Sequence, residues 1–401
     1  MGLLPQRNLT PFFLLLLFSS VAIQESGPAA ILWTAPAILI SALMIAWAAE
    51  SAQYFVAQGF ALAMLAWMQT LPEFAVEAVI AWHRQTELLL ASLTGALRLL
   101  TGLGWPVIYF TAATVHRRRT GKPLGNIRLD EHHAVEVVGL AAPLAYFAFV
   151  IWKGSLAVVD SIVLIGIYAA YLWILGKMPA EDPETIDELE AIPRRIVTSP
   201  RLVRIALITS LFLGGGLLIY YSAEPFLASL LALSTVAGVP AFLFLQWITP
   251  IASEFPEMAS TFYWARTVER APMALMNMVS SNINQWSLLP ALLPVILSVS
   301  AGSVTSIVFD ERQSRELVMT LAQALVSLMF LVNMELVFWE ACTLFVLFVI
   351  PFAYAPAARP VTVIYFAWAA VELARILLGK RRPAALNGFI EVWTTHVRPR
   401  R

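Results

Sequence analysis

The sequence predicts an all-α membrane protein made of an inverted repeat of two five-helix halves. Three observations predict this fold. The composition is strongly apolar, apolar segments of membrane-spanning length recur along almost the whole chain, and the features of the first half return in the same order in the second. An extra C-terminal helix and an N-terminal hydrophobic segment complete the predicted architecture.

The composition excludes an ordinary soluble domain. Of the 401 residues, 59% are hydrophobic and only 13% are charged, which is too few charges for a water-exposed surface. The 26 Lys and Arg residues balance the 26 Asp and Glu residues, so no charge bias indicates nucleic acid as a partner. The expected partner at this point is the lipid bilayer, and the oligomeric state stays open.

The apolar segments divide the chain into five regions. Residues 1–30 hold a short hydrophobic segment, and the sequence leaves open whether it is a signal peptide or an extra helix. The predicted order is then a first repeat of five helices (31–176), a hydrophilic cytoplasmic linker loop (177–204), a second repeat of five helices (205–354), and an extra transmembrane helix with a basic tail (355–401). Within the repeats, we expect helices at 31–55, 57–82, 88–113, 133–152, 155–176, 205–230, 236–264, 272–299, 316–334 and 336–354, and the extra helix at 361–378.

The basic residues predict the orientation. Arg117, Arg118 and Arg119 follow the third segment, Arg194 and Arg195 follow the fifth, and further Lys and Arg residues follow the extra helix. Counted from the segment at 31, all three groups lie on one side of the membrane. The positive-inside rule places that side in the cytoplasm, so we expect a multi-pass protein of the inner (plasma) membrane with a cytoplasmic C-terminus.

Two alignments reveal the internal repeat. TLPEFAV at 70–76 matches EFPEMAS at 254–260, which sets Glu73 against Glu257 at an offset of 184 (257 − 73). The stretch from Leu129 resembles the stretch from Phe309 at an offset of 180 (309 − 129). Five spans is an odd number, so the second half must enter the membrane from the opposite side, as in many secondary transporters.

Each half places a Pro-Glu pair inside an apolar segment, Pro72-Glu73 and Pro256-Glu257. A proline breaks or kinks a helix, and the freed carbonyls need partners in lipid. An unpaired charged carboxylate there costs roughly 2.5–3.5 kcal/mol, and a bound cation or proton relieves that cost. Two matched glutamates therefore predict a cation site, because calcium prefers such oxygens. The alternative, structural kinks with neutral glutamates, stays open.

These stretches resemble the cation/calcium exchanger superfamily, which includes sodium/calcium exchangers. Its signature is a G-T-S-x-P-E stretch on one helix and a G-N-x-x-G-S-N stretch on the next, once in each repeat. In the second repeat ASEFPE (252–257) and NMVSSN (277–282) correspond to them. In the first repeat MQTLPE (68–73) keeps the Pro-Glu, whereas SLTGAL (92–97) keeps only the glycine.

The resemblance implies alternating access by ten core helices, with calcium or a related cation moving against sodium or protons. It implies no enzymatic activity and no cofactor besides the transported cation, which is calcium, sodium or a proton. The candidate cation ligands, from the resemblance and the matching motif positions, are Glu73, Glu257, Thr70, Ser253, Glu254, Asn277, Ser281 and Gln285.

The first repeat departs from the family pattern. Ala96 and Leu100 stand where the family has a serine and an Asn or Asp, which favours an asymmetric site with fewer cation positions. Arg98 lies nearby and is interpreted either as a fixed counter-charge to a carboxylate or as part of an ion pair elsewhere, for instance with Glu87. Glu77 either holds a proton or extends the cation path, or it pairs with Arg84 near the end of its span.

The leading functional hypothesis is a secondary active cation antiporter of the sodium/calcium exchanger type. The alternatives are a cation/proton antiporter without sodium use and a non-transporting membrane receptor or assembly protein that kept the fold. The chain has no Walker A, GxSxG or HExxH motif. Outside the site, Asp160 and Glu340 match at the offset of 180 and are expected at loop ends or helix contacts.

Overall fold

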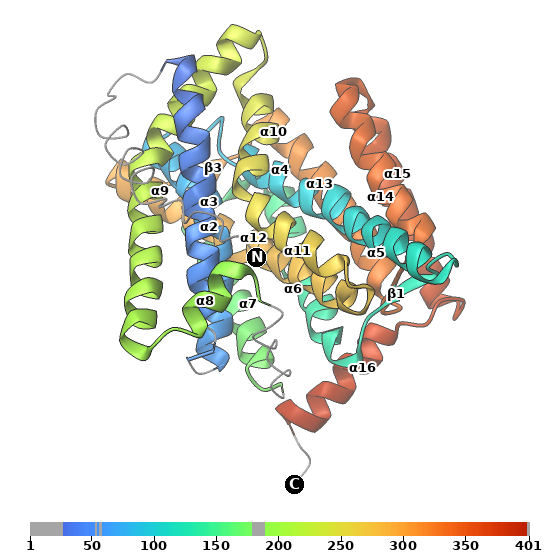
Figure 1. Cartoon of the computed structure of the whole chain (residues 1–401). Helices are drawn as coiled ribbons and strands as arrows, with labels where there is room; N and C mark the ends of the chain where they lie inside the picture. The colour runs from blue at the N-terminus through green and yellow to red at the C-terminus, as the bar shows by residue number, and fades with distance from the viewer. Residues whose placement is uncertain (1–26, 53, 56–57, 179–188, 399–401) are drawn as a thin grey trace.

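A computed structural model describes residues 27–52, 54–55, 58–178 and 189–398 (Figure 1). The first half contains η1 (Pro28–Ala30), α2 (Ile31–Ala52), α3 (Gln58–Trp82), α4 (Ala91–Leu99), the π-helical turn η2 (Leu100–Gly104), α5 (Trp105–Thr120), η3 (Glu131–His133), α6 (Ala134–Lys153) and α7 (Val158–Leu175). The short helix α8 (Ala191–Val197) precedes the second half. That half contains α9 (Arg201–Ala237), α10 (Ala241–Ser253), α11 (Phe255–Ala265), η5 (Val268–Arg270), α12 (Ala271–Ala301), α13 (Glu311–Leu331) and α14 (Phe338–Ala353). The chain then forms η6 (Ala355–Ala357), α15 (Ala358–Leu377), α16 (Ala384–Val392) and η7 (Trp393–Val397).

The protein is a multi-pass helical membrane protein. Among the described residues, eight helices are long and apolar enough to cross a membrane, and two shorter apolar helices, α10 and α14, lie beside them. Most of the predicted N-terminal segment lies outside the described residues. The linker was expected to be a loop, but the part of it that the structure describes contains α8. The tail, expected only as a basic extension, contains α16.

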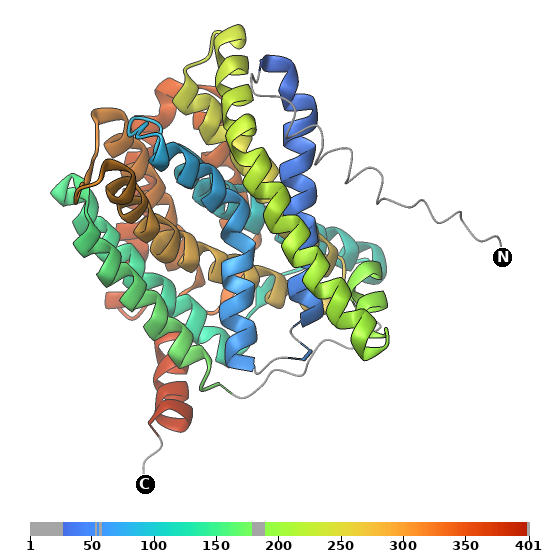
Figure 2. The same ribbon diagram turned by 90° about the vertical axis from the view of Figure 1, so that its left-hand side faces the viewer.

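The prolines of the two Pro-Glu pairs act differently. The second half breaks at this point, because α10 ends at Ser253 and α11 begins at Phe255. In the first half α3 continues through Pro72 and bends along its length (Figure 2). The predicted break or kink is therefore a break in the second half and a bend in the first. A membrane helix tolerates a single proline when neighbouring groups satisfy the freed carbonyl, whereas Pro250 and Pro256 both flank the break in the second half.

Short strands display the symmetry of the repeat. Strand β1 (Asn126–Arg128) pairs antiparallel with β4 (Glu335–Val337), and β2 (Ser155–Leu156) pairs antiparallel with β3 (Ile307–Val308). At the offset of 180, β1 matches β3 (307 − 127) and β2 matches β4 (335 − 155). A two-fold axis that exchanges the halves turns the first pairing into the second. The inverted repeat predicted from the sequence is confirmed.

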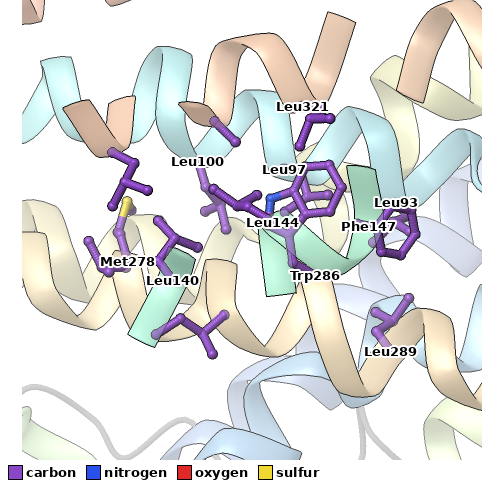
Figure 3. Packing of buried hydrophobic residues seen from close by; sticks show 14 of the residues in the cluster. Leu93, Leu97, Leu100, Leu140, Leu144, Phe147, Met278, Trp286, Leu289 and Leu321 are labelled. Carbon is purple, nitrogen blue, oxygen red and sulfur yellow. The ribbon is translucent and has the colours of Figure 1, made fainter. Parts of the chain in front are cut away.

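Helices of both halves share one apolar core. Figure 3 shows Leu97 of α4, Leu144 and Phe147 of α6, Trp286 of α12 and Leu321 of α13 packed together. The rings of Phe147 and Trp286 meet edge to face with centroids 5.0 Å apart, a favourable aromatic geometry. This core fixes α4, α6 and α13 against α12, the helix that carries most of the predicted polar ligands.

Candidate functional site

The second half builds most of the candidate site from α11 and α12. Glu257, in the first turn of α11, accepts a hydrogen bond from the Ser281 hydroxyl, with Oγ 3.0 Å from Oε2. The Asn277 amide donates to its other oxygen over 3.4 Å. Asn277, Ser281 and Gln285 are each four residues apart, so they share one face of α12. That face points at the acidic segment between α10 and α11.

Glu254 occupies the break between α10 and α11. The Gln285 amide donates to its Oε1 over 3.1 Å. The Glu254 carboxyl also lies within hydrogen-bonding reach of the carboxyl groups of both Glu73 and Glu257. Two carboxyl groups at this distance can share a hydrogen bond only if one of them carries a proton. The helix break thus brings a third acid between the two Pro-Glu glutamates.

The first half contributes Glu73 and Thr70 from α3. The Asn284 amide of α12 donates to the Thr70 hydroxyl over 3.2 Å, which joins the halves at the site. Within the described part of the chain, neither oxygen of Glu73 accepts a hydrogen bond from an N–H or hydroxyl group. Glu73 depends on its acidic neighbours, or on a cation, for a polar partner.

The three carboxyl groups are almost completely buried. The exposed fractions are 0% for Glu73, 2% for Glu254 and 8% for Glu257. Buried like charges repel strongly in a low-dielectric interior, so all three cannot stay ionised without compensation. A divalent cation or protons supply that compensation, and carboxylate oxygens are ligands that calcium prefers.

Ser253, the last residue of α10, lies beside Glu254. Its hydroxyl is buried, and among the described residues it has no hydrogen-bonding partner. A buried hydroxyl without a partner is costly, so this oxygen is suited to a cation or water near the acids. All eight candidate ligands lie in three short segments, 70–73, 253–257 and 277–285.

Glu77 has backbone partners that the sequence did not predict, and its expected role in holding a proton or extending the cation path stays a prediction. It is fully buried one turn beyond Glu73, and it accepts backbone N–H bonds from Leu90 and Leu93, both 3.2 Å long. The pairing with Arg84 is wrong, because Arg84 bonds Ser300 instead. Glu77 holds the start of α4, where Leu90 has a φ of 69°. That left-handed conformation is strained for leucine.

Arg98 forms an ion pair outside the candidate site. Its guanidinium lies 3.0 Å from the Glu316 carboxylate on α13 and 4.9 Å from the ring centroid of Trp247. The alternative of an ion pair elsewhere is confirmed, with Glu316 as the partner instead of Glu87. The pair joins α4 to α10 and α13, so it braces the helices around the acids.

The sequence analysis did not include Asn284 among the candidate site residues, although its polar side chain within an apolar helix could have identified it. Asn284 is a buried polar residue on the long apolar helix α12, directly before the candidate ligand Gln285. In contrast, Ala96 and Leu100 of the first half are fully buried apolar side chains. The first half therefore offers no counterpart to the polar face of α12 at these positions.

Comparisons with known proteins bear on the family and the fold. The family model described as sodium/calcium exchanger protein matches residues 28–177 and 207–355. The crystal structure of the H+/Ca2+ exchanger CAX is similar over 96% of each chain, with a TM-score of 0.86 and 28% identity. Native YfkE (TM-score 0.60, 15% identity, 90% of this chain and 98% of that one) and the sodium-calcium exchanger NCX_Mj (TM-score 0.53, 16% identity, 82% and 98%) share the fold. No curated protein sequence gives a significant match.

Proposed function

This chain belongs to the sodium/calcium exchanger protein family, and from that premise we propose that it is a secondary active antiporter that exchanges calcium for protons. The observation that carries the proposal is the convergence of Glu73, Glu254 and Glu257 from both halves at one buried point. The cation is the transported substrate, and the proposal includes no resident cofactor and no covalent chemistry.

Two observations favour protons over sodium as the counter-ion. First, the similar structure with 28% identity is that of an H+/Ca2+ exchanger, and the likeness extends over 96% of both chains. Second, three adjacent carboxyl groups can take up protons when calcium leaves, whereas sodium ions need additional oxygen ligands. Ala96 and Leu100 remove such ligands from the first half.

The charge balance suggests how exchange is coupled. When calcium binds, its two positive charges offset the acids, and the protons held between Glu254 and its neighbours are released. When protons return, the acids become neutral and the affinity for calcium falls. The site is buried between the halves, and alternating access exposes it to one side of the membrane at a time.

Calcium-45 uptake into proteoliposomes tests the proposal. Uptake driven by a pH gradient should be robust, and uptake driven by a sodium gradient alone should be absent. Glu257→Gln should abolish uptake, whereas Glu87→Gln, an exposed glutamate beyond the end of α3, should leave it unchanged. Uptake that follows only the sodium gradient would refute the proton assignment. The absence of flux for every cation tried would favour the non-transporting receptor.

We further propose that the protein resides in the plasma membrane and that its C-terminus faces the cytoplasm. The basic residues after α5, after α7 and after α15 support this orientation through the positive-inside rule. In Figure 1, α16, which follows α15, lies at the lower end of the molecule. Labelling of an engineered C-terminal cysteine only after membrane permeabilisation is the expected result, with Cys342 replaced by serine.

A further inference from the structure

In the first half, a buried acid at the start of α7 has all its partners within its own repeat. The Asp160 carboxylate accepts the Ala157 N–H at 2.6 Å and the Tyr146 hydroxyl at 2.8 Å. It also forms an ion pair with Lys153, at the end of α6. Asp160 is 2% exposed, and the lysine supplies the positive charge that a buried carboxylate needs.

The second half keeps the acid and loses the cation. At the offset of 180, Glu340 at the start of α14 matches Asp160, and its carboxylate accepts the Val337 N–H at 3.1 Å, as Asp160 accepts that of Ala157. The counterparts of Lys153 and Tyr146 are Asn333 and Val326. Neither carries a charge, so the second repeat does not contain a cation at this position for its buried acid.

A residue from outside the repeat fills this place. The Arg381 guanidinium, in the turn after α15, donates to Glu340 at 2.8 Å. The same side chain donates to the Asn333 amide oxygen and to the Phe330 carbonyl, both at 2.8 Å, and to Glu372 at 2.6 Å. The side chain of Arg381 is 6% exposed, and that of Glu340 is 1% exposed. The planar guanidinium suits several acceptors at once.

The charges of this cluster balance. Glu372, on α15, also accepts a hydrogen bond from Arg375 at 2.8 Å. Two carboxylates, Glu340 and Glu372, therefore meet two guanidinium groups, Arg381 and Arg375. The extra helix thus brings its own acid together with the arginine, and its end is tied to the start of α14 through buried ion pairs.

We propose that Arg381 is a positioning residue that replaces, from the added C-terminal segment, the lysine missing from the second repeat. The segment 372–381 acts as a clip that fixes the α13–α14 corner, where β4 pairs with β1. The extra helix is then a required part of the second repeat and not an appendage. This proposal does not depend on which ion the protein moves.

Thermal unfolding of the full chain in detergent tests the clip. Because removal of one partner strands a buried charge, Arg381→Ala should lower the melting temperature by at least about 5 °C. The neighbouring exposed arginine gives the matched control, and Arg382→Ala should match the wild type. Equal melting temperatures for Arg381→Ala and Arg382→Ala would overturn the proposal.

A symmetry-based rescue separates a specific replacement from general packing. Asn333→Lys restores the lysine of the first repeat, so it should recover at least about half of the lost melting temperature in the Arg381→Ala background. In the wild-type background the same substitution crowds two cations and should lower the melting temperature. If Asn333→Lys does not raise the melting temperature of the Arg381→Ala variant, position 333 is not equivalent to Lys153, and the proposed replacement is refuted. If the Arg381→Ala protein cannot be produced in folded form, Arg381→Lys replaces it in the same melting experiments. The lysine reaches fewer acceptors, so its melting temperature should also fall below that of the wild type.

Discussion

Gly95 on α4 permits the close approach of α10, and its replacement tests whether the site depends on that approach. A Cβ atom at Gly95 would lie 1.8 Å from the backbone oxygen of Gln246 and 2.9 Å from Cγ of Pro250. A carbon–oxygen contact needs roughly 3.3 Å, so Gly95→Ala must separate the two helices locally by about 1.5 Å. The clash is with backbone, and no side-chain rotation relieves it.

The displacement reaches the acids because α10 is short and rigid. This helix ends at Ser253, one residue before Glu254, and close-packed helices transmit strain. By analogy with catalytic sites, where a misplacement of about 1 Å costs about 100-fold, we expect Gly95→Ala to reduce calcium transport by about that factor. Glu254 would move away from Glu73 or from Gln285.

The assay is calcium-45 uptake into proteoliposomes, with gel filtration to confirm that each variant is folded. Gly166→Ala in α7 is the matched control, because no atom lies within 4 Å of the added Cβ, and its uptake should equal that of the wild type. If folded Gly95→Ala transported calcium within about twofold of the wild type, the argument from helix spacing to site geometry would be wrong.

Three further predictions concern single contacts. Ser281→Ala removes the hydroxyl that donates to Glu257, so the calcium concentration for half-maximal uptake should rise about tenfold; an unchanged value would exclude the hydroxyl from the site. Arg98→Met removes the positive charge that pairs with the Glu316 carboxylate and should destabilise the protein by about 3 kcal/mol, with partial recovery in the double variant that adds Glu316→Gln. Additive losses in thermal unfolding would contradict the pairing. Glu77→Ala frees two buried backbone N–H groups and should cost about 2 kcal/mol or more, seen as faster proteolysis between α3 and α4, whereas unchanged proteolysis would show that this turn holds without Glu77.

Span length and hydropathy predicted most of the helices, because a helix in lipid must satisfy its backbone internally and cover the hydrocarbon thickness. The segment expected at 133–152 is α6 (Ala134–Lys153), and the one at 272–299 is α12 (Ala271–Ala301). The repeat offsets predicted the inverted architecture. The helices follow from the hydropathy of contiguous residues, and the inverted repeat follows from similar stretches at a fixed offset. A single sequence contains both kinds of information.

Features that depend on distant partners escaped prediction. Strands β1 and β4 lie about 200 residues apart in the chain, and no alternating pattern marks segments of two or three residues. The pairing of Arg98 with Glu316 depends on how α4 packs against α13. Sequence alone also suggested Arg84 as a partner of Glu77, because it cannot show that this acid accepts the N–H groups at the start of the next helix; whether Glu77 also holds a proton or extends the cation path stays a prediction.

For the candidate site, the sequence predicted which residues to consider, and the structure adds how they meet. Glu73 and Glu257 lie at one buried point, as the matched Pro-Glu pairs suggested, with Glu254 between them. The polar face of α12 follows from the four-residue spacing of Asn277, Ser281 and Gln285. Whether these groups bind the transported ion remains a prediction that the flux experiments test.

The asymmetry of the site bears on its ion chemistry. Among the side chains that the structure describes, α12 presents a row of polar groups to the acids, whereas Ala96 and Leu100 occupy the corresponding positions of the first half. Sodium ions carry one charge each, so several sodium positions would need several sets of neutral oxygens, which Ala96 and Leu100 do not supply at their positions. Protons need only the carboxyl oxygens themselves. A site with three acids and a single polar helix can therefore alternate between one divalent cation and bound protons without further ligands, which is why a pH gradient is the expected driving force.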